Sequence, residues 1–114
     1  MSSELILAPV LSDKLEEWKQ WLSDLNGSRS SEYKDFLERY GITRDRVWLQ
    51  QNPDGSYLAA IIHEGEGAST MMQKFATSDH PFDVEFRNKV AAAHGIDFTQ
   101  PPPPGPELLS DFSL

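Results

Sequence analysis

Two apolar-rich runs lie close together in the middle of the chain, at 47–51 and 57–63. The four residues Asn-Pro-Asp-Gly at 52–55 suit a type I turn, because proline presets φ at the second position and glycine supplies the left-handed residue of a bulged loop. The pattern predicts a β-hairpin. With this turn, Val47 lies opposite Ile61 and every second side chain shares a face.

The register of the hairpin decides which residues share a face. One predicted face carries Val47, Leu49, Gln51, Tyr57, Ala59, Ile61 and His63, and the other carries Arg46, Trp48, Gln50, Leu58, Ala60, Ile62 and Glu64. A loop tighter by one residue would bring Trp48 and His63 onto the same face. Both faces keep apolar centres, which a sheet with one side in water does not need. We therefore expect helices on one face and a second copy of the sheet, or a ligand, on the other.

Outside the hairpin, the sequence predicts one more strand and several helices. The short apolar run 4–11 is typical of a first strand. Apolar residues at three- and four-residue steps predict helices within 15–25 and 33–40, or one long kinked helix across both. Further helices are predicted at 68–76 and 82–94.

Several residues mark where these helices begin and end. Asp13 with Glu16 forms a capping-box pattern, and Gly41 is expected to end the second helix. Pro81 is typical of a first helical residue. Trp18 and Trp21 lie on the apolar stripe of the first helix, so we expect them in the core rather than in a cofactor site.

The C-terminal stretch differs from the rest of the chain. Residues 101–106 are a proline-rich spacer with polyproline geometry, and residues 107–114 are apolar enough to form a last strand or a docked arm. The order of elements predicts a single α+β domain over 1–114, with a ferredoxin-like antiparallel sheet and helices on one face. The second apolar face predicts closure by a homodimer, as in a dimeric α+β barrel.

Composition narrows the functional classes. The chain has no cysteine, which excludes disulfides and thiolate sites. With 18 acidic and 10 basic residues, the net charge of −8 disfavours nucleic acid and anionic lipid. No stretch is long and apolar enough to span a bilayer, and no secretory signal is evident, so we expect a cytoplasmic protein without a membrane partner.

Arg46, Trp48 and Gln50 are the strongest candidates for a ligand site. A cation, a flat apolar surface and an amide on one face suit a small aromatic or acidic ligand. In the alternative interpretation, which we prefer, Trp48 fills a dimer core and Gln50 bonds across the interface.

The histidines are the natural acid–base and metal candidates. Their spacing matches no zinc motif, so we predict no metal site and no cofactor. His63 and His80 are retained as candidates, together with Glu64 and Asp79, if the chain returns to the end of the hairpin. His94, before a glycine, is expected to interact with a helix C-terminus.

A set of short motifs distributed over nearly the whole chain resembles a known family. These motifs lie at 8–11, 14–18, 41–44, 47–51, 78–83, 94–97 and 106–109. They are similar to those of a family of small uncharacterised bacterial proteins, and the fold resembles the dimeric α+β-barrel superfamily. The resemblance implies a dimer and brings no established reaction.

The wider superfamily includes cofactor-independent monooxygenases, haem-degrading enzymes and mutarotases. Some of its oxygenases use a Trp, an Asn and a His in a cleft, whereas this chain offers Trp48 and His63 without a strand Asn. The function is therefore expected to be that of a dimeric protein without a catalytic signature. The alternative is a small-molecule binder, or a monooxygenase- or isomerase-type enzyme, with a cleft around Trp48 and a histidine.

Overall fold

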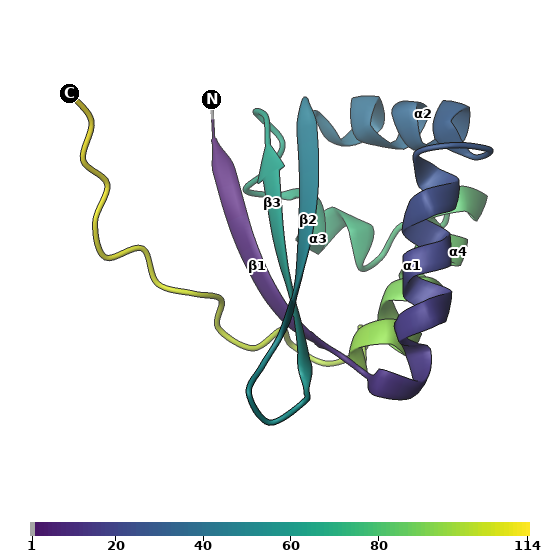
Figure 1. The fold of residues 1–114 in the computed structure, drawn as a ribbon. Helices are drawn as coiled ribbons and strands as arrows, with labels where there is room; N and C mark the ends of the chain where they lie inside the picture. Colours follow the sequence, from purple (N-terminus) through teal and green to yellow (C-terminus); the bar gives the residue numbers. More distant parts are fainter. Residues whose placement is uncertain (1) are drawn as a thin grey trace.

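The strands and the helices form two layers in a computed structural model that describes residues 2–114 (Figure 1). The sheet contains β1 (Ser3–Val10), β2 (Arg44–Gln51) and β3 (Tyr57–Glu64). It is antiparallel with the order β1-β3-β2, so β3 is central and β2 is an edge strand. The helix layer contains a 3-10 turn, η1 (Ser12–Lys14), and the helices α1 (Leu15–Leu25), α2 (Ser30–Tyr40), α3 (Met71–Phe75) and α4 (Pro81–His94). The α+β class predicted from the sequence is confirmed.

The predicted register of the hairpin is also confirmed. Val47 pairs with Ile61. The backbone N–H of Asn52 donates to Ser56 at 2.7 Å, and Gly55 has a φ of 88°. Because the turn fixes this register, Trp48 and His63 project from opposite faces of the sheet.

The core lies between the helices and one face of the sheet. Ala59, at the centre of β3, is fully buried there, and Leu25 and Phe36 are 1% exposed. Trp18 and Trp21 belong to the same cluster, as their position on the apolar stripe predicts. The centre of the sheet face turned toward the helices is therefore covered within one chain, whereas Leu49 near the end of β2 is 40% exposed on the same face.

The opposite face of the sheet, which we call the outer face, has no helix on it (Figure 1). It retains large apolar side chains at Leu5, Leu7 and Trp48, which are 44%, 46% and 48% exposed. Leu5 and Leu7 of β1 pair with Ile62 and Ala60 of β3, so the apolar residues of the three strands are contiguous on this face.

Helix ends differ in part from the prediction. Asp13 lies in the 3-10 turn, and α1 starts at Leu15 without a side-chain cap, so the predicted capping box is not formed. α1 and α2 are separate helices rather than one kinked helix. The predicted ends at Gly41 and Pro81 are confirmed: Gly41 adopts a φ of 69°, and Pro81 is the first residue of α4.

The loop after β3 passes very close to the end of α2. The N–H of Gly67 donates to the carbonyl of Gly41 at 3.1 Å. A Cβ on Gly67 would lie 1.7 Å from the carbonyl oxygen of Tyr40. The contact therefore requires a residue without a side chain.

Residues 101–114 form neither helix nor strand and are exposed along their length. Figure 1 shows them running away from the two layers, beyond β1. The sequence predicts a last strand or docked arm at 107–114, but within residues 2–114 the sheet has three strands. The apolar residues of this segment, Leu108, Leu109, Phe112 and Leu114, contact no core.

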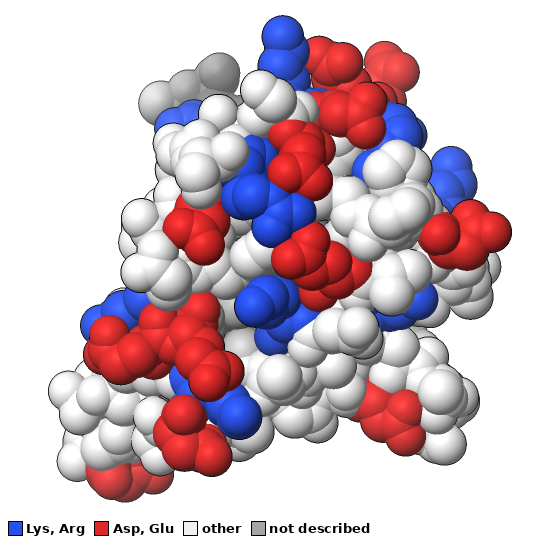
Figure 2. Space-filling model, turned by 90° about the vertical axis from the view of Figure 1, so that its right-hand side faces the viewer, with Lys and Arg blue, Asp and Glu red and all other residues white. Residues whose placement is uncertain are grey.

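Acidic and basic side chains are intermingled on the helix side of the molecule (Figure 2). Several form ion pairs, including Arg29 with Glu85 at 2.6 Å and Arg39 with Asp35 at 2.9 Å. Among residues 2–114, no helix has the length and apolar character needed to cross a membrane.

Candidate functional site

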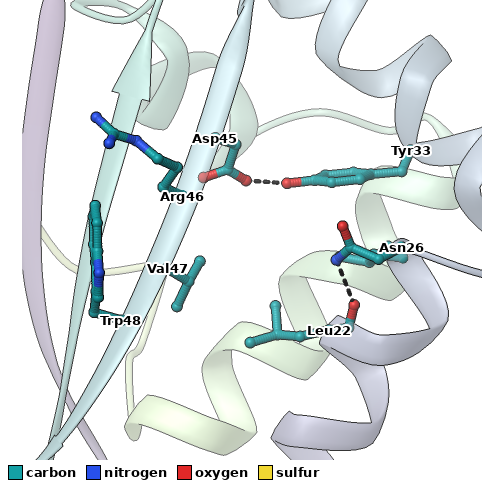
Figure 3. A pocket seen from close by; sticks show the side chains of 8 residues that line it. Leu22, Asn26, Tyr33, Asp45, Arg46, Val47 and Trp48 are labelled. Atoms are coloured by element: carbon teal, nitrogen blue, oxygen red, sulfur yellow. Dashed lines mark hydrogen bonds between the residues drawn. The ribbon is translucent and has the colours of Figure 1, made fainter.

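A pocket of about 390 Å³ lies beside edge strand β2, where the strand faces the end of α1 and the first turns of α2 (Figure 3). We call it the β2-edge pocket. It is lined by Leu22, Leu25, Asn26, Tyr33, Asp45, Arg46, Val47 and Trp48. β2 is at the edge of the sheet, so no strand lies along this side of it. The pocket occupies that side, where the backbone groups of β2 have no neighbouring strand to pair with.

Asp45 is the main polar group on the wall of this pocket. The register places it on the inner face of β2, and its side chain is only 8% exposed. The hydroxyl of Tyr33 donates to Asp45 Oδ2. The second oxygen, Oδ1, is buried without a hydrogen-bond partner among the described residues. A buried carboxylate with only one oxygen satisfied is unfavourable unless something else supplies a donor.

His63 is the nearest basic side chain to this carboxylate. Its Nε2 lies 3.5 Å from Asp45 Oδ1, and its side chain is 7% exposed. Burial lowers the pKa of His63, although the carboxylates of Asp45 and Glu4 act in the opposite direction. The two side chains form a buried pair that is ionic only when the imidazole carries a proton.

At neutral pH the hydroxyl of Tyr33 keeps its proton and acts as a hydrogen-bond donor. Burial and the adjacent Asp45 carboxylate raise the pKa of its hydroxyl. The ring stacks beside Phe36 with 6.1 Å between centroids, which anchors Tyr33 to the core. Tyr33 therefore holds Asp45 in place from α2 through one hydrogen bond.

Arg46 and Trp48 are brought together as the sequence predicts, on the outer side of β2. The guanidinium carbon lies 5.1 Å from the centre of the Trp48 ring. Arg46 Nη2 is 3.7 Å from Glu64, which provides a counter-charge, and Arg46 Nε is buried without a partner. Figure 3 shows both side chains projecting from β2 on the side opposite to Asp45.

The other predicted site residues lie elsewhere. Gln50 is exposed near the turn, where its amide donates to Asn52 at 3.3 Å. His80 caps α4, because its Nδ1 accepts from the N–H of Phe82 at 3.2 Å. The five candidates therefore do not form one site: Arg46, Trp48 and Gln50 lie on the outer face, His63 on the inner face and His80 at a helix end.

His94 was expected to interact with a helix C-terminus, and it instead joins α4 to β1. Its Nδ1 donates to the carbonyl of Pro9 at 2.7 Å. Among the residues that the structure describes, no group of three or more histidine, aspartate or glutamate side chains could hold a metal ion.

Sequence reasoning missed Tyr33 and Asp45. A signal for Asp45 was present, because the alternation that places Val47 and Leu49 on the inner face also places Asp45 there. A carboxylate on a core-facing position is uncommon unless it is paired. Nothing in the sequence indicated that Tyr33, twelve residues earlier on a helix, would be its partner.

Comparisons with known proteins add one finding. The sequence model of a family of unknown function matches residues 1–100. No curated protein and no solved structure gives a significant match.

Proposed function

The chain belongs to DUF6176, a family of unknown function, and we propose from its geometry that it binds a small organic molecule in the β2-edge pocket. The observation that carries this proposal is a pocket of about 390 Å³ beside β2 that is lined by apolar side chains and by the largely buried residue Asp45. Ligand pockets are commonly roughly 300–1,000 Å³ in volume, so this one suits a small molecule.

The lining supports binding rather than a reaction. Leu22 and Val47 supply apolar surface, and Asp45 supplies a fixed polar group, which is the usual composition of a small-molecule site. The monooxygenase- or isomerase-type alternative needs Trp48 and a histidine in one cleft. Trp48 and His63 lie on opposite faces of the sheet, which favours a binder over such an enzyme.

A fragment screen on the intact protein tests this proposal. Binding is expected to shift the backbone NMR signals of residues 45–48 and 22–26 more than those of other residues. Val47→Phe, which fills the pocket, is expected to abolish these shifts, whereas Leu49→Phe, on the same face but outside the lining, is expected to preserve them. A screen in which no fragment perturbs these residues, or in which Val47→Phe binds normally, would overturn the proposal.

A second candidate function is assembly into a homodimer through the outer face. The exposure of Leu5, Leu7 and Trp48 on a face without helices favours it, because a contiguous apolar patch on a small protein commonly marks an interface. Two ferredoxin-like sheets packed in this way would form the dimeric α+β barrel that the sequence resembles. Residues 107–114 would then supply the missing strand or an arm along the free edge of β1.

Sedimentation at micromolar concentration tests the dimer. The wild-type protein is expected to sediment as a dimer and Leu7→Glu as a monomer. Leu11→Glu is the matched control, because Leu11 is 42% exposed but lies outside the sheet. Removing residues 107–114 is expected to weaken the dimer. A monomeric wild-type protein would exclude this assembly.

A cytoplasmic location and a bacterial origin stay predictions from the sequence.

A further inference from the structure

We propose that residues 107–114, which we call the arm, cross to a second copy of the chain and bind there as an added strand along the free edge of β2, beside residues 47–51. This inference rests on the homodimer, the second candidate function. It names the element that each copy contributes and the edge that receives it. The small-molecule proposal for the β2-edge pocket does not depend on it.

The free edge of β2 is open to another strand between residues 47 and 51. The backbone N–H of Asn52 donates to Ser56 at 2.7 Å, so this pair is hydrogen-bonded within the hairpin. Because bonded and non-bonded pairs alternate along an antiparallel ladder, Val47, Leu49 and Gln51 direct their backbone N–H and carbonyl groups away from β3. Within residues 2–114, no strand pairs with this side of β2. A row of donors and acceptors is therefore in position for a further strand.

The two edges of the sheet differ in how they are protected from such pairing. The edge strand β1 contains Pro9, which has no N–H to donate. At the start of β2, the hydroxyl of Tyr33 reaches from α2 to Asp45. Residues 47–51 carry neither a charge nor a proline, and Leu49 is exposed among them. Native proteins usually cover an apolar edge of this kind, because it would otherwise pair with other chains.

The arm has a residue pattern that suits this edge. Its large apolar side chains are strongly exposed and contact no core in their own chain. In an extended strand, side chains alternate between two faces. One face of the arm then carries Leu108, Phe112 and Leu114, and the other carries Glu107, Leu109 and Asp111. The arm therefore has one apolar face and one acidic face.

These two faces match the two sides of β2. The acidic face suits the outer side, where Arg44 is exposed and Arg46 lies over Trp48. The apolar face suits the inner side, which carries Val47 and Leu49. Figure 3 shows Val47 in the space between β2 and α1. The reverse orientation would place the two carboxylates of the arm against this apolar side, so the alternation determines which way the arm faces.

The position of the arm in its own chain indicates that the recipient is a second copy. Figure 1 shows the arm beyond β1, at the opposite edge of the sheet from β2, and running in the direction opposite to β1. The proline-rich residues 101–106 form a semi-rigid spacer that carries the arm away from its own sheet.

Two-fold symmetry brings the arm to the partner's β2. When two outer faces stack about a two-fold axis parallel to the strands, β1 of one copy lies over β2 of the other. The arm beyond β1 then lies beside the partner's β2. It runs antiparallel to that strand, because β1 and β2 both pair antiparallel with β3 and therefore run in the same direction.

Hydrogen exchange measured by NMR on the intact protein tests the added strand. The amides of Val47 and Leu49 are expected to exchange at least about 10-fold more slowly in the wild type than in Phe112→Asp, because the arm bonds to them. The amides of Trp48 and Gln50, which bond to β3, should be protected in both proteins. Alternating protection is specific to strand pairing, since burial of a whole face would not distinguish neighbouring amides. Gln100→Asp, an exposed position outside the arm, adds the same charge and should keep the protection.

Cross-linking tests whether the arm crosses to a second copy. The chain has no cysteine, so Gln50→Cys and Leu109→Cys can be placed in separate copies, one of them enlarged by a fusion tag. A short bismaleimide is expected to yield a product of mixed size. Lys34→Cys, exposed on α2, replaces Gln50→Cys as the control and should give none. The Gln50→Cys, Leu109→Cys double variant, diluted into excess wild-type protein, should not link within one chain.

The outcomes separate this inference from the homodimer. If sedimentation shows a dimer but Val47 and Leu49 exchange freely, or Phe112→Asp protects them as the wild type does, the added strand is wrong and the dimer survives. The same holds if no product of mixed size forms, or if the diluted double variant links within its own chain. A monomeric wild-type protein at micromolar concentration would overturn both.

Discussion

Arg39 on α2 reaches Asp83 on α4 with both terminal nitrogens: Nη1 donates to Oδ2 at 3.0 Å and Nη2 to Oδ1 at 2.7 Å. The hydroxyls of Tyr40 and Ser78 each donate to the same carboxylate at 2.7 Å. Asp83 is fully buried, so its charge is matched by one cation and four hydrogen bonds. The side chain of Asp45 is 8% exposed, receives one hydrogen bond, from Tyr33, and lies 3.5 Å from His63 Nε2, so its charge is matched less completely than that of Asp83.

Arg39→Met removes the cation from a buried pair and leaves the carboxylate of Asp83 without compensation. The free energy of unfolding is expected to fall by roughly 3 kcal/mol in a urea titration. Lys34→Met is the control, because Lys34 lies 3.9 Å from Glu38 in an exposed pair, and it should change the free energy by less than about 0.5 kcal/mol. Similar losses in both variants would contradict a structural role for the Arg39–Asp83 pair.

The two buried carboxylates are expected to respond differently to neutralisation. Asp83→Asn replaces an acceptor that is fully bonded, so the free energy of unfolding should fall by about 2 kcal/mol. Asp45→Asn changes a side chain that has one hydrogen bond and a histidine 3.5 Å away, so the free energy of unfolding should fall by less than in Asp83→Asn. Urea titrations of the two variants without ligand compare them, and a large loss for Asp45→Asn would show that the charge is stabilised within the chain.

Stability is expected to fall when the solution becomes mildly acidic. Burial lowers the pKa of His63 and His94 in the folded protein. In the unfolded chain both titrate near pH 6.5, at roughly their ordinary value. The unfolded chain therefore takes up protons first as the pH drops below that value, and stability declines until the folded pKa values are passed.

The free energy of unfolding, measured between about pH 8 and pH 5, should decrease in the wild type. The decrease should be smaller in a His63→Gln, His94→Gln double variant. Asp83 does not contribute over this range: burial acts to raise its pKa, but hydrogen bonds from Arg39, Ser78 and Tyr40 outweigh it and lower the pKa to about 2. Equal pH dependence in both proteins would assign the decline to other groups.

Gly67→Ala is expected to be severely destabilising, because the added Cβ would lie 1.7 Å from the carbonyl oxygen of Tyr40. The loop after β3 would have to move away from α2, and a loss of about 3 kcal/mol or more is expected in a thermal or urea titration. Gly105→Ala, at a position with no atom within 4 Å, should be silent. A silent Gly67→Ala would mean that the loop can retreat from α2 without loss.

Local patterns determined much of the fold. The turn at 52–55 fixed the hairpin register, because proline and glycine allow few backbone conformations there. The apolar stripes fixed which helix faces are buried, including Trp18 and Trp21. Helix starts were less predictable, since Asp13 is drawn into a 3-10 turn when the chain leaves β1.

The sequence by itself determined the strands, the helices and the two apolar faces of the hairpin, because those depend on periodicities that neighbouring residues share. Only the tertiary structure determined where the pocket lies and which residues line it. Tyr33 and Asp45 meet because α2 packs against the edge strand. Arg39 and Asp83, 44 residues apart, meet because α2 and α4 cover the same face. Which buried carboxylate has a cation depends on such long-range packing, and no local pattern of residues records it.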